Sequence, residues 1–246
     1  MHRFLGWIRH TAYKVLGSNC YGCEKPLQGE TNPIWCPECL DLLKPVCRCT
    51  TCGTLMEMPV ERCGGCVSDP PPWDRLYCVG EYNQPLSQYV QGLKYRRQVW
   101  HARELASLLA ERLTSPALIL LPIPLHWRRQ SVRGFNQSDY LAEYLSQSLK
   151  EKAGVESQVL SKAIKRIKVT KTQMGLNRRQ RLVNLKHAFS LSPRYLTRIQ
   201  NQPHIALVDD VVTTGSTVAE VCLLLREQGV KRIDVYCICR ASKPIS

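Results

Sequence analysis

Four Cys-x-x-Cys pairs follow one another early in the chain, and no other feature limits its fold as strongly. Each such turn aims two sulfurs at one point, and two turns together complete a tetrahedral site for zinc. The spacing therefore predicts two zinc ions. Their expected ligands are eight cysteines: Cys20, Cys23, Cys36, Cys39, Cys49, Cys52, Cys63 and Cys66.

The sequence leaves open how these turns pair. Sequential pairing gives two zinc ribbons in a row, whereas a cross-braced arrangement joins the first pair to the third and the second to the fourth. Cys47 lies two residues before Cys49 and is an alternative ligand. A disulfide framework would need an oxidising compartment, and because we find no export signal we favour zinc. The remaining cysteines lie in apolar patterns and are expected in the core: Cys78, Cys222, Cys237 and Cys239.

Three successive prolines after the last pair indicate a stiff linker, because proline enters neither a sheet interior nor a helix. We therefore expect an N-terminal amphipathic segment over residues 1–19 and a double zinc ribbon over residues 20–68. The linker covers residues 69–75, and a larger domain covers residues 76–246. The amphipathic segment either packs on the protein or lies at a membrane interface.

The larger domain alternates strand and helix patterns. Strands are expected in LYCVGEY, ALILLPIPLH, HIALV and RIDVYCICR, and helices over 85–95, 101–113, 138–149 and around VAEVCLLLREQG, which Gly229 ends. This alternation predicts an open parallel α/β sheet, in which ligands gather beyond the carboxyl ends of the strands.

The stretch IALVDDVVTTGSTV lies at such an end. We expect Asp209 and Asp210 to end the strand and Val211 to Thr217 to form the turn into a helix. The hydroxyls, Gly215 and the backbone N–H groups of this turn suit a phosphate, while the two acids suit sugar hydroxyls if Mg²⁺ neutralises a nearby pyrophosphate. A Walker B strand would need a Walker A loop, and the chain has no Gly-Lys dipeptide. A plain strand-to-helix turn leaves the paired acids unexplained.

The stretch resembles the phosphoribosyl-pyrophosphate (PRPP) motif of type I phosphoribosyltransferases, which has an apolar run, two acids and a T-T-G-x-T loop. The resemblance implies that Asp209 and Asp210 hold the ribose hydroxyls and serve any catalysis. It also implies the PRPP-binding set Asp209, Asp210, Val211, Thr213, Thr214, Gly215, Ser216 and Thr217.

Over nearly its whole length the chain resembles the ComF family of DNA-uptake and DNA-utilisation proteins. The specific parts are RGFNQ and a Q-x-x-L-x-x-x-x-R-x-x-N-x-x-x-A-F pattern that begins at Gln173 and ends at Phe189. The implied fold is a phosphoribosyltransferase-like α/β domain with a small N-terminal zinc-ribbon domain. The implied setting is natural transformation or DNA utilisation.

Basic residues give the chain a formal net charge of +14, and no acid occurs between Ser157 and Val208. Such charge predicts an anionic partner. Two loops supply candidates for contacting pyrophosphate, and the second loop matches a mobile flap in related transferases. The candidates are Arg128, Arg129, Arg133, Gly134, Lys171 and Arg181. Candidates for contacting single-stranded DNA are Lys168, Lys171, Arg178 and Arg179, with Tyr95, Trp100 and Trp127 as stacking partners.

Two functions are consistent with these features. One is a module that binds PRPP or a similar phosphosugar, with Mg²⁺, and single-stranded DNA. The other is a phosphoribosyltransferase of nucleotide salvage, whose acceptor base the sequence does not identify. A separate protein would supply any ATP-driven motor of DNA uptake. We expect a cytoplasmic protein without a transmembrane segment, or one attached peripherally at the inner membrane.

Overall fold

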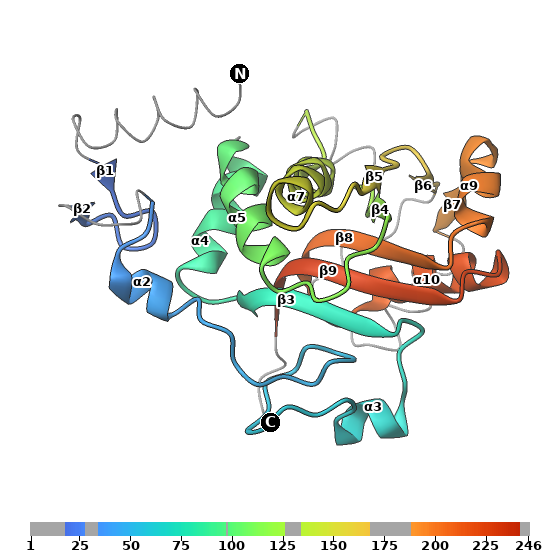
Figure 1. The fold of residues 1–246 in the computed structure, drawn as a ribbon, viewed down its shortest axis with the longest axis horizontal. Coiled ribbons are helices and arrows are strands. Elements are labelled where there is room, and N and C mark those ends of the chain that lie inside the picture. The colour runs from blue at the N-terminus through green and yellow to red at the C-terminus, as the bar shows by residue number, and fades with distance from the viewer. Residues whose placement is uncertain (1–17, 28–33, 97, 126–133, 168–187, 242–246) are drawn as a thin grey trace.

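The computed structural model describes residues 18–27, 34–96, 98–125, 134–167 and 188–241 (Figure 1). The strands are β1 (Ser18–Asn19), β2 (Pro26–Leu27), β3 (Arg75–Glu81), β4 (Ile119–Pro122), β5 (Gln158–Val159), β6 (Ile164–Arg166), β7 (Phe189–Leu191), β8 (His204–Val212) and β9 (Arg232–Arg240). The helices are α2 (Pro37–Asp41), α3 (Gly64–Ser68), α4 (Leu86–Tyr95), α5 (Trp100–Ala110), α7 (Gln137–Ala153), η1 (Pro193–Tyr195), α9 (Leu196–Gln200) and α10 (Ser216–Glu227).

A five-stranded sheet in the order β3-β9-β8-β4-β5 forms the centre of the larger domain. Every neighbouring pair in it is parallel. The carboxyl ends of all five strands therefore lie at one edge, as the alternating sequence pattern predicts, and the predicted parallel α/β fold is confirmed.

Helices cover both faces of this sheet. Helices α4, α5 and α7 lie on one face in Figure 1, where they pack against Leu120, Val208 and Tyr236. Helix α10 covers the other face and packs against Leu207 and Val235. Successive strand residues point to opposite faces, and this is why β4 is apolar throughout and buried at all its positions.

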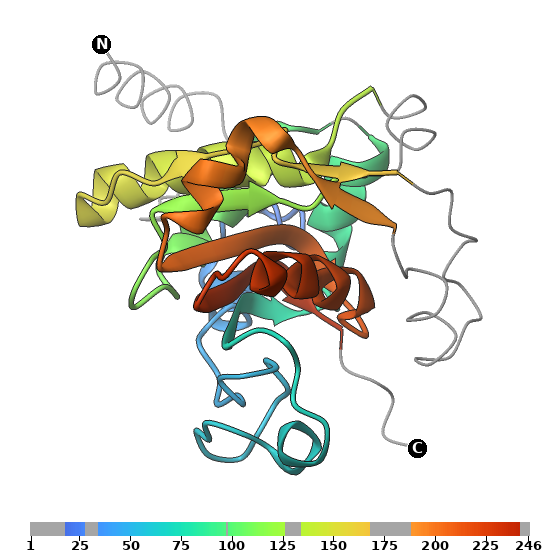
Figure 2. The same cartoon turned by 90° about the vertical axis from the view of Figure 1, so that its right-hand side faces the viewer.

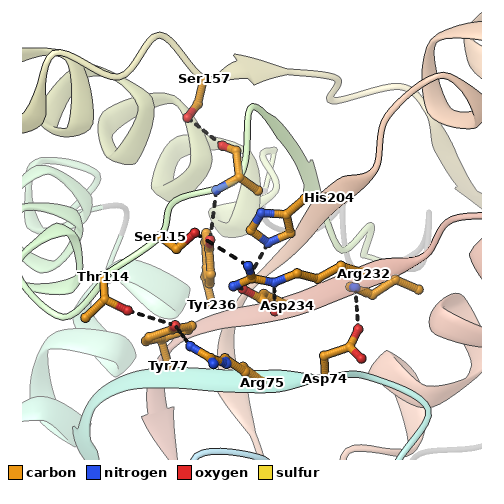
Figure 3. A network of polar contacts seen from close by, with 12 residues as sticks. Asp74, Arg75, Tyr77, Thr114, Ser115, Ser157, His204, Arg232, Asp234 and Tyr236 are labelled. Carbon is orange, nitrogen blue, oxygen red and sulfur yellow. Dashed lines mark hydrogen bonds and ion pairs between the residues drawn. The ribbon is translucent and has the colours of Figure 1, made fainter.

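A polar network ties the amino-terminal edge of the sheet together (Figure 3). Asp234 is fully buried, and its carboxylate accepts hydrogen bonds from Arg232 at 2.8 Å and from His204 at 2.9 Å. The hydroxyl of Tyr236 accepts a hydrogen bond from the backbone N–H of Ala117 at 3.0 Å. These groups satisfy one another, so this edge is a structural tie.

The two groups of cysteines dock at different places on the larger domain. Cys20, Cys36 and Cys39 share the core beside α4 with Trp35, whose ring centroid lies 4.7 Å from that of Tyr89. The later group pairs along β3, where the backbone N–H of Leu76 donates to the carbonyl of Thr50 at 2.9 Å. Figure 2 shows this later segment, with α3, projecting below the sheet.

One expected boundary is wrong. Strand β8 does not end at Asp209 and Asp210 but continues to Val212, because β9 extends the ladder by pairing Val211 with Cys239 and Val212 with Arg240. The turn is thereby shortened to Thr213–Gly215, and α10 begins at Ser216.

The expectations for Gly229 and for the core cysteines are confirmed. Gly229 follows α10 with a φ of +85°, the left-handed conformation expected of a residue that ends a helix. Cys78, Cys222, Cys237 and Cys239 are buried. Within the described ranges, every helix is too short or too polar to cross a bilayer.

Candidate functional site

Asp210 is the most tightly held side chain at the carboxyl end of β8. It is only 4% exposed. Lys94, near the end of α4, places its Nζ 2.8 Å from Oδ1 of Asp210, and Gln137, the first residue of α7, donates from Nε2 to Oδ2 at 2.7 Å. Both carboxylate oxygens are thus occupied, so Asp210 is fixed in orientation and its charge is balanced.

Among the described residues, Asp209 is held through one carboxylate oxygen. Its Oδ1 accepts hydrogen bonds from Ser138 Oγ at 3.2 Å and from the backbone N–H of Asp210 at 2.9 Å. Burial and then the neighbouring charge of Asp210 raise the pKa of Asp209 to about 7, although Lys94 opposes the shift. Among the described residues, both of these hydrogen bonds go to Oδ1 and none goes to Oδ2.

The N-terminus of α7 supplies the groups that hold the two acids. Asn136 caps this helix: its Oδ1 accepts the N–H of Ser138 at 3.4 Å, and its Nδ2 donates to the carbonyl of Ile123 at 3.2 Å. Asn136, Gln137 and Ser138 are all buried. The end of RGFNQ and the serine after it therefore brace the acidic pair.

Thr213–Gly215, which we call the phosphate loop, connects β8 to α10. Gly215 has a φ of +75°, a conformation that disfavours any side chain. Thr214 Oγ1 lies 2.9 Å from Ser216 Oγ. The loop thus presents hydroxyls beside the first amides of a twelve-residue helix, an arrangement that suits an anion. Thr213 is exposed, Thr214 and Thr217 are partly buried, and Val211 lies within β8.

The structure thus brings Asp209, Asp210 and the phosphate loop together at one edge of the sheet. Gly134 is exposed and has a φ of +80°. The basic candidates and one aromatic candidate lie outside the described residues: Arg128, Arg129, Arg133, Lys168, Lys171, Arg178, Arg179, Arg181 and Trp127.

Sequence reasoning missed three residues of this site, namely Lys94, Gln137 and Ser138. For Gln137 and Ser138 a signal existed, because Asn136 is a typical N-cap residue and indicates that an amphipathic helix begins directly after it. Lys94 gave none, since its position beside Asp210 depends on how α4 packs on the sheet.

Sulfurs of the eight expected ligands converge in two clusters. The first cluster comprises Cys20, Cys23, Cys36 and Cys39, and the second comprises Cys49, Cys52, Cys63 and Cys66. This is the sequential pairing. Cys47 belongs to neither cluster.

The geometry of both clusters fits a metal ion better than disulfides. Sulfurs lie 3.7 Å apart between Cys23 and Cys36, and 3.6 Å apart between Cys52 and Cys63. Four Zn–S bonds of about 2.3 Å in a tetrahedron would separate the sulfurs by about 3.8 Å, whereas a disulfide would bring them to about 2.05 Å. All thirteen cysteines are free, and each cluster could hold one zinc ion.

Backbone amides also prepare the sulfurs to bind a cation. The N–H groups of Gly22 and Cys36 point at Cys20 Sγ, at 3.3 and 3.2 Å. Burial raises the pKa of Cys20, but these amides outweigh it and lower the value to about 7. In the second cluster the N–H of Cys63 donates to Cys49 Sγ at 3.2 Å.

An aromatic pocket of about 470 Å³ lies between the first cluster and α4–α5. Tyr21, Tyr89, Trp100 and His101 contribute its rings, and Arg96 contributes a cation. Trp100 is 49% exposed, whereas the hydroxyl of Tyr89 is buried without a hydrogen-bond partner in the described part of the chain. The expected stacking residue Trp100 therefore forms part of a larger aromatic surface. Tyr95, at the end of α4, is 70% exposed.

Comparisons with known proteins agree with this geometry. Residues 151–245 match the family model of the phosphoribosyl transferase domain. Over 234 residues the chain is 37% identical to Competence protein F of Haemophilus influenzae, which covers 90% of this chain and 96% of that protein. It is 39% identical over 230 residues to DNA utilization protein YhgH of Salmonella typhimurium, with the same coverage. It is 27% identical over 211 residues to Competence protein ComFC of Streptococcus pneumoniae, covering 79% of this chain and 88% of that protein.

Proposed function

This chain belongs to the ComF family, the family of Competence protein F and DNA utilization protein YhgH, and we propose that it binds a phosphorylated ribose and single-stranded DNA during DNA uptake or utilisation. The phosphosugar is PRPP or a close analogue, bound with Mg²⁺. Each of the two cysteine clusters holds a zinc ion.

The arrangement of Asp209 beside the phosphate loop carries the phosphosugar proposal. Lys94 neutralises Asp210, while Oδ2 of Asp209 has no hydrogen-bond partner within the part of the chain that the structure describes. An ionised carboxylate only accepts hydrogen bonds, so at a pH above about 7 Asp209 selects hydroxyl groups over phosphate oxygens. The loop amides select the phosphate. A ligand that carries a vicinal diol and a phosphate satisfies both halves of the site.

Ribose 5-phosphate and 2-deoxyribose 5-phosphate test whether the acids recognise the sugar hydroxyls, because the two sugars differ by one hydroxyl. We expect titration calorimetry to show the deoxy sugar binding about 10- to 150-fold more weakly, since a hydrogen bond to a charged group contributes about 1.5–3 kcal/mol. Equal affinities would remove Asp209 and Asp210 from the recognition of ribose.

The aromatic pocket and the basic window support the DNA proposal. Bases of any sequence stack on aromatic rings, while phosphates attract Lys and Arg. Arg96 lies beside the rings of the pocket. Lys168, Lys171, Arg178 and Arg179 would contribute further phosphate contacts.

Trp100 provides the direct test. Trp100→Ala should weaken binding of single-stranded DNA about 5- to 150-fold in fluorescence anisotropy, because stacking contributes about 1–3 kcal/mol per base. Leu223→Ala is the matched control, since Leu223 is 51% exposed but lies on α10. Similar losses in the two variants would contradict stacking at this pocket.

Charge reversal tests the basic window separately. Reversing Lys168, Lys171, Arg178 and Arg179 should flatten the slope of log K against log salt, because fewer counterions are released. An unchanged slope would place DNA elsewhere.

Phosphoribosyl transfer is the second candidate, favoured by the match of residues 151–245 to the phosphoribosyl transferase domain. In that reaction the bond from C1 of the ribose to pyrophosphate breaks, a bond to the acceptor forms, and the acceptor loses a proton. Because the acids and the loop hold the sugar in place, the reaction would need no protein nucleophile. Pyrophosphate release against a panel of bases and short DNA distinguishes the two candidates: turnover establishes transfer, and binding without turnover establishes the module.

A further inference from the structure

We propose that the second cluster holds the phosphate loop in its binding conformation through Arg240 and Trp73, so that metal at the cluster and ligand at the loop stabilise each other. The ligand half of this inference rests on the proposed function. The structural half concerns only residues of this chain.

Arg240 joins a ligand residue of the second cluster to the start of the phosphate loop. It is the last residue of β9 and pairs with Val212 at the end of β8. Its Nε donates to the carbonyl of Cys52 at 2.8 Å. Its Nη1 donates to the carbonyl of Val212 at 3.0 Å and also to that of Thr213. A single guanidinium thus fixes the cluster and the loop relative to each other.

Trp73 makes a second, independent link. Its Nε1 donates to the carbonyl of Thr51 at 2.7 Å. On its other side the indole ring packs against Gly215: a Cβ placed on this glycine would lie 2.6 Å from Cη2 of the ring. Trp73 is only 8% exposed, so this packing is tight. The indole therefore contacts both the cysteine turn and the end of the loop, and it fixes their relative position.

The whole turn between the first two ligands of the second cluster is tied to the larger domain. In addition to the carbonyls of Thr51 and Cys52, that of Thr50 accepts the N–H of Leu76 at 2.9 Å. The carbonyl of Gly53 accepts from Arg48, which also pairs with Glu81 at 2.5 Å. Four successive carbonyls thus point outward at fixed partners. Closure of the turn by Cys49 and Cys52 around a metal keeps them so aligned.

Two consequences follow from these links. Loss of metal from the second cluster should loosen the loop, because the carbonyls that accept hydrogen bonds from Arg240 and Trp73 would no longer be held in place. Conversely, a ligand that orders the loop should slow loss of the metal. Thermodynamic linkage requires metal to raise the affinity for ligand by the same factor by which ligand raises the affinity for metal, and such couplings usually change affinities about 5- to 150-fold.

Zinc transfer to the chelating dye 4-(2-pyridylazo)resorcinol tests the ligand half on the zinc-loaded full chain. With Mg²⁺ present, saturating PRPP should slow one of the two release phases and lower the fraction of zinc transferred at equilibrium, the latter corresponding to an affinity at least about fivefold higher. Arg240→Gln with Trp73→Phe should remove this protection while leaving two zinc ions per chain. Arg232→Gln is the matched control, because Arg232 lies at the opposite end of β9 and bonds to Asp234.

Hydrogen exchange tests the structural half without PRPP. Amides of residues 212–218 should exchange faster in the Arg240→Gln, Trp73→Phe variant and after partial zinc removal, but not in Arg232→Gln. Unchanged exchange in this segment would overturn the inference. So would PRPP binding, seen by calorimetry, that leaves both zinc-release rates unaltered. If PRPP gives no binding heat yet exchange depends on Arg240 and Trp73, the proposed function fails and the bracing of the loop stands.

Discussion

At the scale of single residues, the candidate site is a balance of three charges. Asp210 and Lys94 form a buried ion pair. Asp209 therefore shares the positive charge of Lys94 with Asp210. Burial, and after it the negative charge of Asp210, raise the pKa of Asp209, so the ionised form of this acid has a free-energy cost. This cost is the expected signature of a carboxylate placed for a ligand and not for stability.

Asp209→Asn should therefore stabilise the unliganded protein by about 1–3 kcal/mol at pH 8. An acid whose folded-state pKa lies above its unfolded value destabilises the fold increasingly as pH rises from about 4 to about 7. The advantage of the asparagine should accordingly shrink by about 1 kcal/mol between pH 8 and pH 6. Urea unfolding of zinc-loaded protein at the two pH values measures it. An asparagine variant less stable than the wild type at pH 8 would contradict the account.

The acids could be recognised from sequence, whereas their partners could not. Asp209 and Asp210 stand in a contiguous motif at the end of an apolar run, and such a run fixes their place at the edge of the sheet. The bond from Gln137 to Asp210 joins residues 73 positions apart. Contacts of that range depend on helix packing, which periodicity does not specify.

At the scale of elements, β8, the phosphate loop and α10 form one unit whose shape depends on Gly215. The sequence predicted the strand, the turn and the helix in order. It placed the end of the strand too early, because two aspartates disfavour β structure locally while the ladder to β9 overrides that preference. The contact of Trp73 with Gly215 was not foreseen, since it brings together residues that are far apart in the sequence.

Gly215→Ala should destabilise the protein and weaken phosphosugar binding more than Gly154→Ala does. Both glycines have positive φ, at +75° and +67°, so both substitutions introduce backbone strain. Only at Gly215 would the new methyl group also collide with Trp73, because around Gly154 there is open space. We expect an additional cost of about 1–3 kcal/mol at Gly215, measured by thermal unfolding, together with a reduced affinity in calorimetry. Equal effects at the two positions would show that Trp73 yields without cost.

At the scale of the whole molecule, the cysteine clusters are built into the larger domain at two separate places. The first packs beside α4, the helix that supplies Lys94, and the second bonds to β3 and to Arg240 of β9, which also bonds to the start of the phosphate loop. Cysteine spacing predicted two Cys₄ sites and left the pairing open, which the structure resolves as sequential. The place where each cluster docks could not be predicted from the sequence. Docking depends on backbone carbonyls such as those of Thr51 and Cys52, and the residues that donate to them belong to no recognisable motif.

The central claim is that the carboxyl edge of β8 binds a phosphosugar through its acidic pair. The most direct measurement is calorimetric titration of Mg²⁺-PRPP into the zinc-loaded wild type and into the Asp209→Asn, Asp210→Asn variant. The account predicts saturable binding to the wild type and no measurable binding to the variant, with two zinc ions per chain and an unchanged circular dichroism spectrum in both. Equal affinity in the two proteins, or no binding by a zinc-loaded wild type, would contradict it.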